Sequence, residues 1–210
     1  MKKFLCFLAA CFCVLALKSQ DHEYVDLGLP SGTLWATCNI GASTPNESGT
    51  FFAWGECEGD KSAYNETTYK YISAGKWQKY CTDATLGSVD NKTSLDPEDD
   101  AATCLWGEDW CMPSVEQVEE LVRYCKAKET KQKRKKGLLF TGSNGNTIFI
   151  PYGGVRYKTE KLLKNESGCY WTKEISPKLS NIAAFFNLDM MEVRYHDRYN
   201  GYLIRPVKNK

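Results

Sequence analysis

The stretch AAFFNLDMMEVRYHDRYNGYLIRPV (residues 183–207) decides the fold prediction, because its residues alternate in the way that predicts a β-strand. Phe186, Leu188 and Met190 occupy alternate positions, and a β-strand sends alternate side chains to opposite faces. We therefore expect these three side chains in a core. The opposite, displayed row then comprises Phe185, Asn187, Asp189 and Met191, continued by Arg194 and His196.

A helix is predicted upstream, near residues 114–125. Ser114 can cap it, and Gln117 three positions later completes a capping box. Apolar residues then recur at the i, i+3, i+4 spacing of an amphipathic helix, as far as Cys125. Glutamates fill the other face.

The segment from Cys57 to Ala102 is polar and has no sustained periodicity, which predicts a long irregular insertion. Aromatic residues are expected to pin it to the core: Tyr69, Tyr71, Trp77 and Tyr80. Near its end, Asp96 followed by Pro97 indicates a capped helix start. A calcium loop is the alternative, built from Asp90, Asp96, Asp99 and Asp100, but the spacing and glycine of an EF-hand are missing. We expect no metal and no cofactor.

Short strands are predicted elsewhere. Residues 23–37 form two strands around a Pro-Ser-Gly turn, residues 51–56 form an aromatic strand, and residues 138–151 form a hairpin around Ser-Asn-Gly-Asn. The basic run at 126–137 is interpreted as an exposed strand and turn kept soluble by charge. The alternative is a polyanion-binding patch, which the lack of interleaved aromatic residues disfavours.

The N-terminus has the layout of a secretory signal peptide over residues 1–19. Lys2 and Lys3 precede an apolar run from residue 4 to residue 17, and a polar segment follows. We expect cleavage near Ser19–Gln20, and a secreted or outer-surface location. Lipoprotein anchoring at Cys11 is the alternative, although the apolar run continues past that cysteine.

Charge and cysteine content narrow the function classes. Loss of Lys2, Lys3 and Lys18 would lower the 27 basic residues to 24, against 26 acidic residues. Such a nearly neutral protein gives no global sign of nucleic-acid binding. Three of the ten cysteines fall in the expected signal peptide, and the odd number left means that at least one is unpaired within the chain. Cys104–Cys111 is the nearest pair in sequence and the favoured bridge.

Signals for catalysis are poor. The two histidines, His22 and His196, lie in no metal or triad pattern, and no nucleophile elbow, phosphate loop or dinucleotide fingerprint occurs. Cys111 precedes the predicted helix, where a thiolate would be favoured, but no histidine partner is in view. The sequence therefore predicts a protein that is not an enzyme.

Several segments together resemble one known family. They are EYVDLGLPSGTLWATCNIGA, FFAWGE, KYCTD, VDNKTSLDPEDDAA, LWGEDWCMPSVEQVEEL, TGSNGNTIFIP, CYWT and RYNGYLIRPV, in that order. This series closely resembles the Fibrobacter succinogenes major paralogous domain family, secreted or surface proteins of Bacteroidetes-type bacteria that look like a branch of the C-type-lectin-like superfamily. The chain departs from the pattern at Cys111, where the family usually has arginine, and at Thr172 and Lys173, where it usually has two serines.

The resemblance implies one α+β domain over residues 20–210, of C-type-lectin-like fold, with its terminal strands near Tyr24–Leu27 and Tyr202–Val207 paired. It implies an exposed ligand-binding face at about residues 170–200, which adds Tyr170, Trp171 and Lys173 to the displayed row. The expected function is recognition of a glycan or protein ligand on a cell surface or polymer, with no nucleic acid and no membrane span after signal removal. A structural module of the cell envelope is the alternative. A remote alternative is an enzyme of the formylglycine-generating type. Such enzymes hold copper with a pair of cysteines, and no pair in this sequence matches it.

Overall fold

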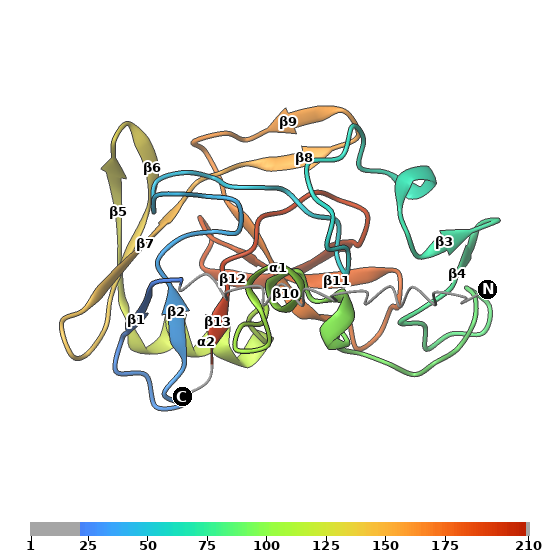
Figure 1. The fold of residues 1–210 in the computed structure, drawn as a ribbon, viewed down its shortest axis with the longest axis horizontal. Helices are drawn as coiled ribbons and strands as arrows, with labels where there is room; N and C mark the ends of the chain where they lie inside the picture. The colour runs from blue at the N-terminus through green and yellow to red at the C-terminus, as the bar shows by residue number, and fades with distance from the viewer. Residues whose placement is uncertain (1–21, 209–210) are drawn as a thin grey trace, which may run out of the picture.

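The computed structural model describes residues 22–208, so the expected signal peptide and its cleavage site lie outside the described residues. The fold is mixed, with small sheets and few helices (Figure 1). In chain order the elements are β1 (Tyr24–Asp26), β2 (Leu34–Ala36), η1 (Glu66–Thr68), β3 (Ile72–Ser73), β4 (Lys76–Trp77), η2 (Pro97–Asp99), α1 (Ala101–Trp106), α2 (Val115–Tyr124), β5 (Lys126–Gln132), β6 (Lys135–Thr141), β7 (Thr147–Pro151), β8 (Val155–Tyr157), β9 (Glu160–Leu162), β10 (Cys169–Ile175), β11 (Ile182–Asn187), β12 (Glu192–Asp197) and β13 (Val207–Lys208). Within residues 22–208, no helix has the length and apolar character that a membrane crossing needs.

The two ends of the described chain share one sheet, in the order β1-β2-β13. The expectation that the first and last strands pair directly was wrong, because β2 lies between them and Trp35 faces both Val25 and Val207. Arg205, just before β13, reinforces this closure. Its fully buried guanidinium donates to the carbonyl of Ala36 at 3.0 Å and to Asn39 Oδ1 at 2.7 Å.

The predicted helix is α2, and its capping box is confirmed. Ser114 Oγ accepts from the Gln117 amide at 3.1 Å, and Gln117 Oε1 accepts from the Ser114 amide at 2.9 Å. Val118 and Leu121 are buried on the face that packs against the β10-β11-β12 sheet. The second predicted helix start is shifted. Asp96 precedes only the short η2 and makes no capping bond, whereas Asp100 Oδ1 caps α1.

The insertion at 57–102 is held by one arginine as well as by its aromatic residues. Tyr69, Tyr71, Trp77 and Tyr80 are buried, as predicted. Their rings and that of Trp54 surround the buried Arg198 guanidinium at 4.5 to 5.7 Å. The guanidinium also donates to the carbonyls of Lys79, Tyr80 and Ser180 at 3.0 to 3.1 Å, and to the Tyr69 hydroxyl. A cation near the end of the chain thus organises a segment about a hundred residues upstream.

Two further expectations were wrong. Residues 51–56 are a buried irregular segment with one isolated bridge, Phe52–Tyr202, and not a strand. The disulfide joins Cys57 to Cys104 and not Cys104 to Cys111. The backbone of Cys111 instead exchanges two hydrogen bonds with that of Val207, and this places its side chain at the edge of the terminal sheet. Two other expectations are confirmed. The basic run at 126–137 forms an exposed strand and turn, and residues 138–151 form the predicted hairpin.

The alternation in the opening stretch ends sooner than predicted. β11 is the central strand of its sheet, and both of its faces are buried, so Phe185 is 5% exposed like Phe186 at 2%. Residues 188–191 form the turn to β12 and not more strand. Leu188 is buried, as expected, but Met190 is 52% exposed.

Alanine substitutions should separate these two turn residues. Leu188→Ala removes a fully buried side chain and should lower the free energy of unfolding by roughly 2–5 kcal/mol. Met190→Ala should change it by about 0.5 kcal/mol or less, because Met190 is half exposed. Urea denaturation of both variants measures this. Equal losses would show that Met190 packs in a core.

Candidate functional site

The aromatic residues of the predicted binding face belong to the core. Tyr170 and Trp171 are 2% and 0% exposed. The Tyr170 hydroxyl donates to the carbonyl of Pro151 at 2.6 Å, and Trp171 Nε1 donates to the carbonyl of Phe52 at 2.8 Å. Phe185 was also expected at the surface, but its ring is buried against Trp171 and Tyr202. These three side chains cannot touch a ligand at the surface.

The other predicted residues are at least partly accessible, with Lys173 on β10 and the rest along the β11–β12 hairpin. Asp189, Met191, Arg194 and His196 are exposed, and Lys173 and Asn187 are half-buried. Local contacts hold several of them: Asp189 accepts from Ser167, Arg194 pairs with Glu192, and His196 Nδ1 accepts from the Asp197 amide at 2.8 Å. Met191 lines a groove of about 410 Å³ between α2 and β12, with Val118 and Val122 on the helix side.

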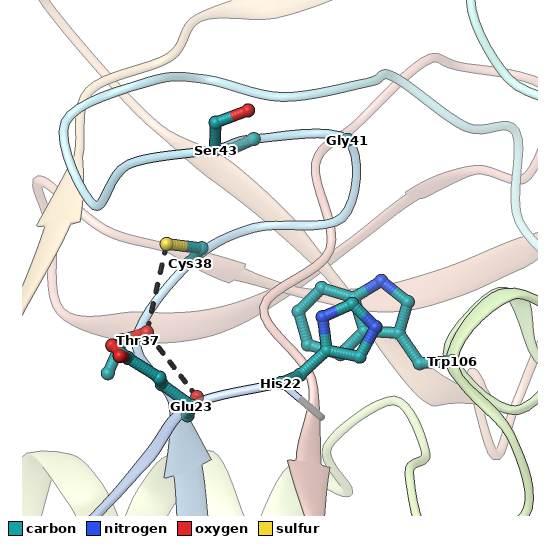
Figure 2. A pocket seen from close by; sticks show the side chains of 8 residues that line it. His22, Glu23, Thr37, Cys38, Gly41, Ser43 and Trp106 are labelled. Carbon is teal, nitrogen blue, oxygen red and sulfur yellow. Dashed lines mark hydrogen bonds between the residues drawn. The ribbon is translucent and has the colours of Figure 1, made fainter. Parts of the chain in front are cut away.

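A second hollow lies beside the start of the described chain and has about 510 Å³ (Figure 2). Its lining includes His22, Glu23, Cys38 and Trp106. The His22 imidazole stacks on Trp106 at 3.6 Å, while the Cys38 thiol accepts from Thr37 Oγ1 at 3.7 Å on the other side of the pocket (Figure 2). The thiol and the imidazole thus point to different sides of this hollow (Figure 2).

A third pocket, of about 570 Å³, combines aromatic and polar side chains. It is lined by Asn65, Glu66, Thr67, Tyr157, Lys158, Thr159 and Tyr199, and we call it the Tyr157–Tyr199 pocket. Tyr157 is 41% exposed. Burial, aided by the neighbouring Asp197 carboxylate, raises the pKa of Tyr199 above its ordinary value, so its hydroxyl stays protonated.

Backbone hydrogen bonds hold the three segments around this pocket in register. Tyr64 and Lys158 exchange bonds of 2.9 and 3.0 Å, which joins the chain before η1 to the tip of the β8–β9 hairpin. Arg156 and Gly201 exchange bonds of 2.7 and 2.8 Å, which joins the same hairpin to the segment after Tyr199. The pocket is therefore preformed. Tyr199 lies in the window predicted from the sequence, and Asn65 lies in the predicted insertion, but no sequence pattern marked Tyr157.

The acidic residues of the alternative calcium loop are largely occupied by lysines and amides. Carboxylate oxygens of Asp96, Glu98 and Asp99 lie within 4.8 Å of one another. Lys79 Nζ lies 2.5 Å from Asp99 and 2.7 Å from Asp96. Burial alone would raise the pKa of Asp99, but hydrogen bonds, chiefly from Lys79, hold it well below its ordinary value. Asp90 accepts from the amides of residues 80 and 81, and Asp100 caps α1.

Comparisons of the chain with protein-family models, with curated proteins and with solved structures gave no match.

Proposed function

We propose that this chain is an exported, non-catalytic surface protein that recognises a glycan, and that the Tyr157–Tyr199 pocket holds a sugar residue. One observation carries the proposal: a preformed pocket of about 570 Å³ has two tyrosines among hydrogen-bonding side chains. Binding sites are typically concave, with aromatic walls and a few placed polar groups. A pyranose matches this, since its C–H faces stack on aromatic rings and its hydroxyls bond to polar atoms.

The polar groups suit hydroxyl recognition. Glu66 offers a carboxylate acceptor, Lys158 a cationic donor, and Thr159 a hydroxyl that can donate or accept. The Lys158 ammonium lies 5.3 Å from the centre of the Tyr157 ring, which orders that ring at the rim. A ring held in place loses little conformational entropy when a ligand stacks on it.

The C-type-lectin-like fold and the family resemblance are part of this proposal. The shared sheet β1-β2-β13 and the packing of α2 on β10-β11-β12 support them. Export rests on the N-terminal sequence pattern. The proposed ligand site differs from the face expected from the sequence, because three of that face's side chains are buried.

Glycan-array binding tests the pocket. Tyr157→Ala should weaken capture of a bound glycan about tenfold or more, because aromatic anchors carry much of the binding energy at such sites. Tyr195→Ala is the matched control, since Tyr195 is 42% exposed and lies on the edge strand β12. It should leave binding unchanged.

A quadruple alanine variant of Asn187, Asp189, Arg194 and His196 tests the β11–β12 hairpin as the site instead. If that variant loses a glycan that the Tyr157→Ala protein still binds, the ligand sits on the hairpin and not in the pocket. If both bind normally, neither surface is the site.

A further inference from the structure

Basic side chains from two hairpins meet at one corner of the molecule. The turn between β5 and β6 and the start of β6 supply Lys133, Arg134 and Lys135. Strand β9 supplies Lys161, and the segment after it supplies Lys164. In Figure 1 the open end of the β8–β9 hairpin, away from its tip, lies toward β6 and β7. We call this set of five residues the basic corner.

Hydrogen bonds through Tyr152 connect the two hairpins. The Tyr152 amide donates to the carbonyl of Lys136 at 2.7 Å, and the Tyr152 carbonyl accepts from the Asn165 amide at 3.1 Å. Burial, and then repulsion from Lys164, lowers the pKa of Lys135. Burial, followed by repulsion from Lys135 and Lys164, lowers the pKa of Lys161. The Lys135 ammonium donates to Ser48 Oγ at 3.2 Å, and the Lys161 ammonium lies 4.4 Å from the centre of the Phe51 ring, so both lysines lie over the segment at residues 48–51.

Carboxylates do not neutralise the corner by direct contact. Within the described residues, the carboxylates in salt-bridge contact are paired with other lysines, with Arg194 and with His196. Asp60 favours the charge of Lys161, and Lys133 favours that of Glu47, but neither pair is in salt-bridge contact. An almost neutral protein thus carries a concentrated positive field at one corner.

Two exposed leucines interrupt the lysines there. Leu162 is 40% exposed and Leu163 is 48% exposed, between Lys161 and Lys164. Leu163 has a φ of 56°, in the left-handed region that glycine and asparagine tolerate far better than leucine. A bulky apolar side chain is therefore held outward in a backbone conformation that disfavours it, and such outliers often mark functional positions.

We propose that the basic corner docks on the surface of an anionic lipid bilayer, with Leu162 and Leu163 entering the boundary between headgroups and acyl chains. Lysines next to an anionic leaflet gain electrostatic attraction, and apolar side chains gain by leaving water. A polysaccharide or nucleic acid would satisfy the lysines but would offer the leucines no apolar phase. Docking is peripheral and involves a part of the hairpin away from the tip that lines the Tyr157–Tyr199 pocket.

Vesicle cosedimentation tests the proposal with the purified protein and phosphatidylcholine vesicles that contain or lack phosphatidylglycerol. We expect binding only to the anionic vesicles, and weaker binding as salt rises. Each lysine near the surface is worth about fivefold in affinity, so Lys135→Gln/Lys161→Gln/Lys164→Gln should weaken binding about a hundredfold. Leu162→Ser/Leu163→Ser should weaken it about tenfold or more.

Matched controls remove the same residue types elsewhere. Lys126→Gln/Lys128→Gln/Lys178→Gln takes three exposed lysines from outside the basic corner. Leu105→Ser/Leu179→Ser takes two leucines that are 50% and 52% exposed. Both variants should bind anionic vesicles as the unaltered protein does. Equal losses in the controls would overturn the proposal, as would a failure of the unaltered protein to bind.

Leu163→Asn separates a lipid-binding role from a structural one. Asparagine tolerates the left-handed conformation, so the urea midpoint should rise while vesicle binding weakens several-fold. Unchanged vesicle binding by this variant and by the double-serine variant would overturn the leucine insertion. Capture by heparin or DNA with no binding to anionic vesicles would assign the corner to a soluble polyanion, and would also overturn the proposal.

Discussion

Replacement of Arg198 by alanine is expected to lower the free energy of unfolding by about 4 kcal/mol or more, because a buried and multiply hydrogen-bonded cation is lost. The guanidinium is fully buried and lies among five aromatic rings. Its removal leaves the carbonyls of Lys79, Tyr80 and Ser180 without their donor, and opens a cavity between the insertion and the core.

Lysine at the same position should recover only part of the loss. It keeps the charge, but its ammonium cannot donate in a planar fork to separate carbonyls, so we expect a deficit of about 2 kcal/mol. Arg194→Ala is the control, because Arg194 is 49% exposed and pairs with Glu192 at the surface. Urea denaturation should show a change of about 0.5 kcal/mol or less for it. Similar midpoints for the Arg198 and Arg194 variants would contradict the account of the aromatic enclosure.

Loss of the Cys57–Cys104 disulfide should have a comparable effect, about 4 kcal/mol, from the chain entropy of its loop. The two cysteines are 47 residues apart, and the loop that they close contains the whole irregular insertion. Cys57→Ser/Cys104→Ser removes the constraint from the unfolded chain while leaving two small side chains. Denaturation of the oxidised protein and of this variant measures the difference.

Cys38→Ser is the control for the disulfide, because Cys38 is a half-buried free thiol. It should change stability by about 0.5 kcal/mol. Peptide mapping without reductant should recover residues 57 and 104 in one linked fragment. A fragment that links Cys104 to Cys111 instead would restore the pairing favoured by sequence spacing.

Local signals predicted the parts of this fold that depend on neighbouring residues. The capping box at Ser114 and Gln117 and the hairpin at 138–151 are confirmed because their hydrogen bonds and turn lie within a few residues. The alternation correctly placed Phe186 and Leu188 in the core, but it was wrong for Met190, and it wrongly assumed that the opposite face of the strand, with Phe185, is exposed to solvent. Tertiary packing covers both faces of β11, and a turn ends the strand at Asn187.

The candidate sites were less predictable for the same physical reason. Tyr157, Tyr199 and Asn65 meet only because the β8–β9 hairpin bonds to residues on either side of it in space, and no spacing in the sequence reports that. The basic corner is likewise assembled by the fold from segments that are separate in the sequence. Its run at 133–135 was visible in the sequence, but Lys161 and Lys164 join it through the fold.

The C-terminal arginines also set the order in which this protein can fold during synthesis. Arg198 completes the enclosure around the insertion, and Arg205 anchors the last strand to β2 near the other end of the chain. Contacts between such distant positions form slowly, because a long loop must close before they contribute. A chain that does not yet contain residues 198 and 205 lacks both cations, and with them the hydrogen bonds to the insertion and to the end of β2 and the residue after it. The enclosure around the insertion and the anchoring of the last strand are therefore late contacts, which form only after residues 198 and 205 have joined the rest of the fold.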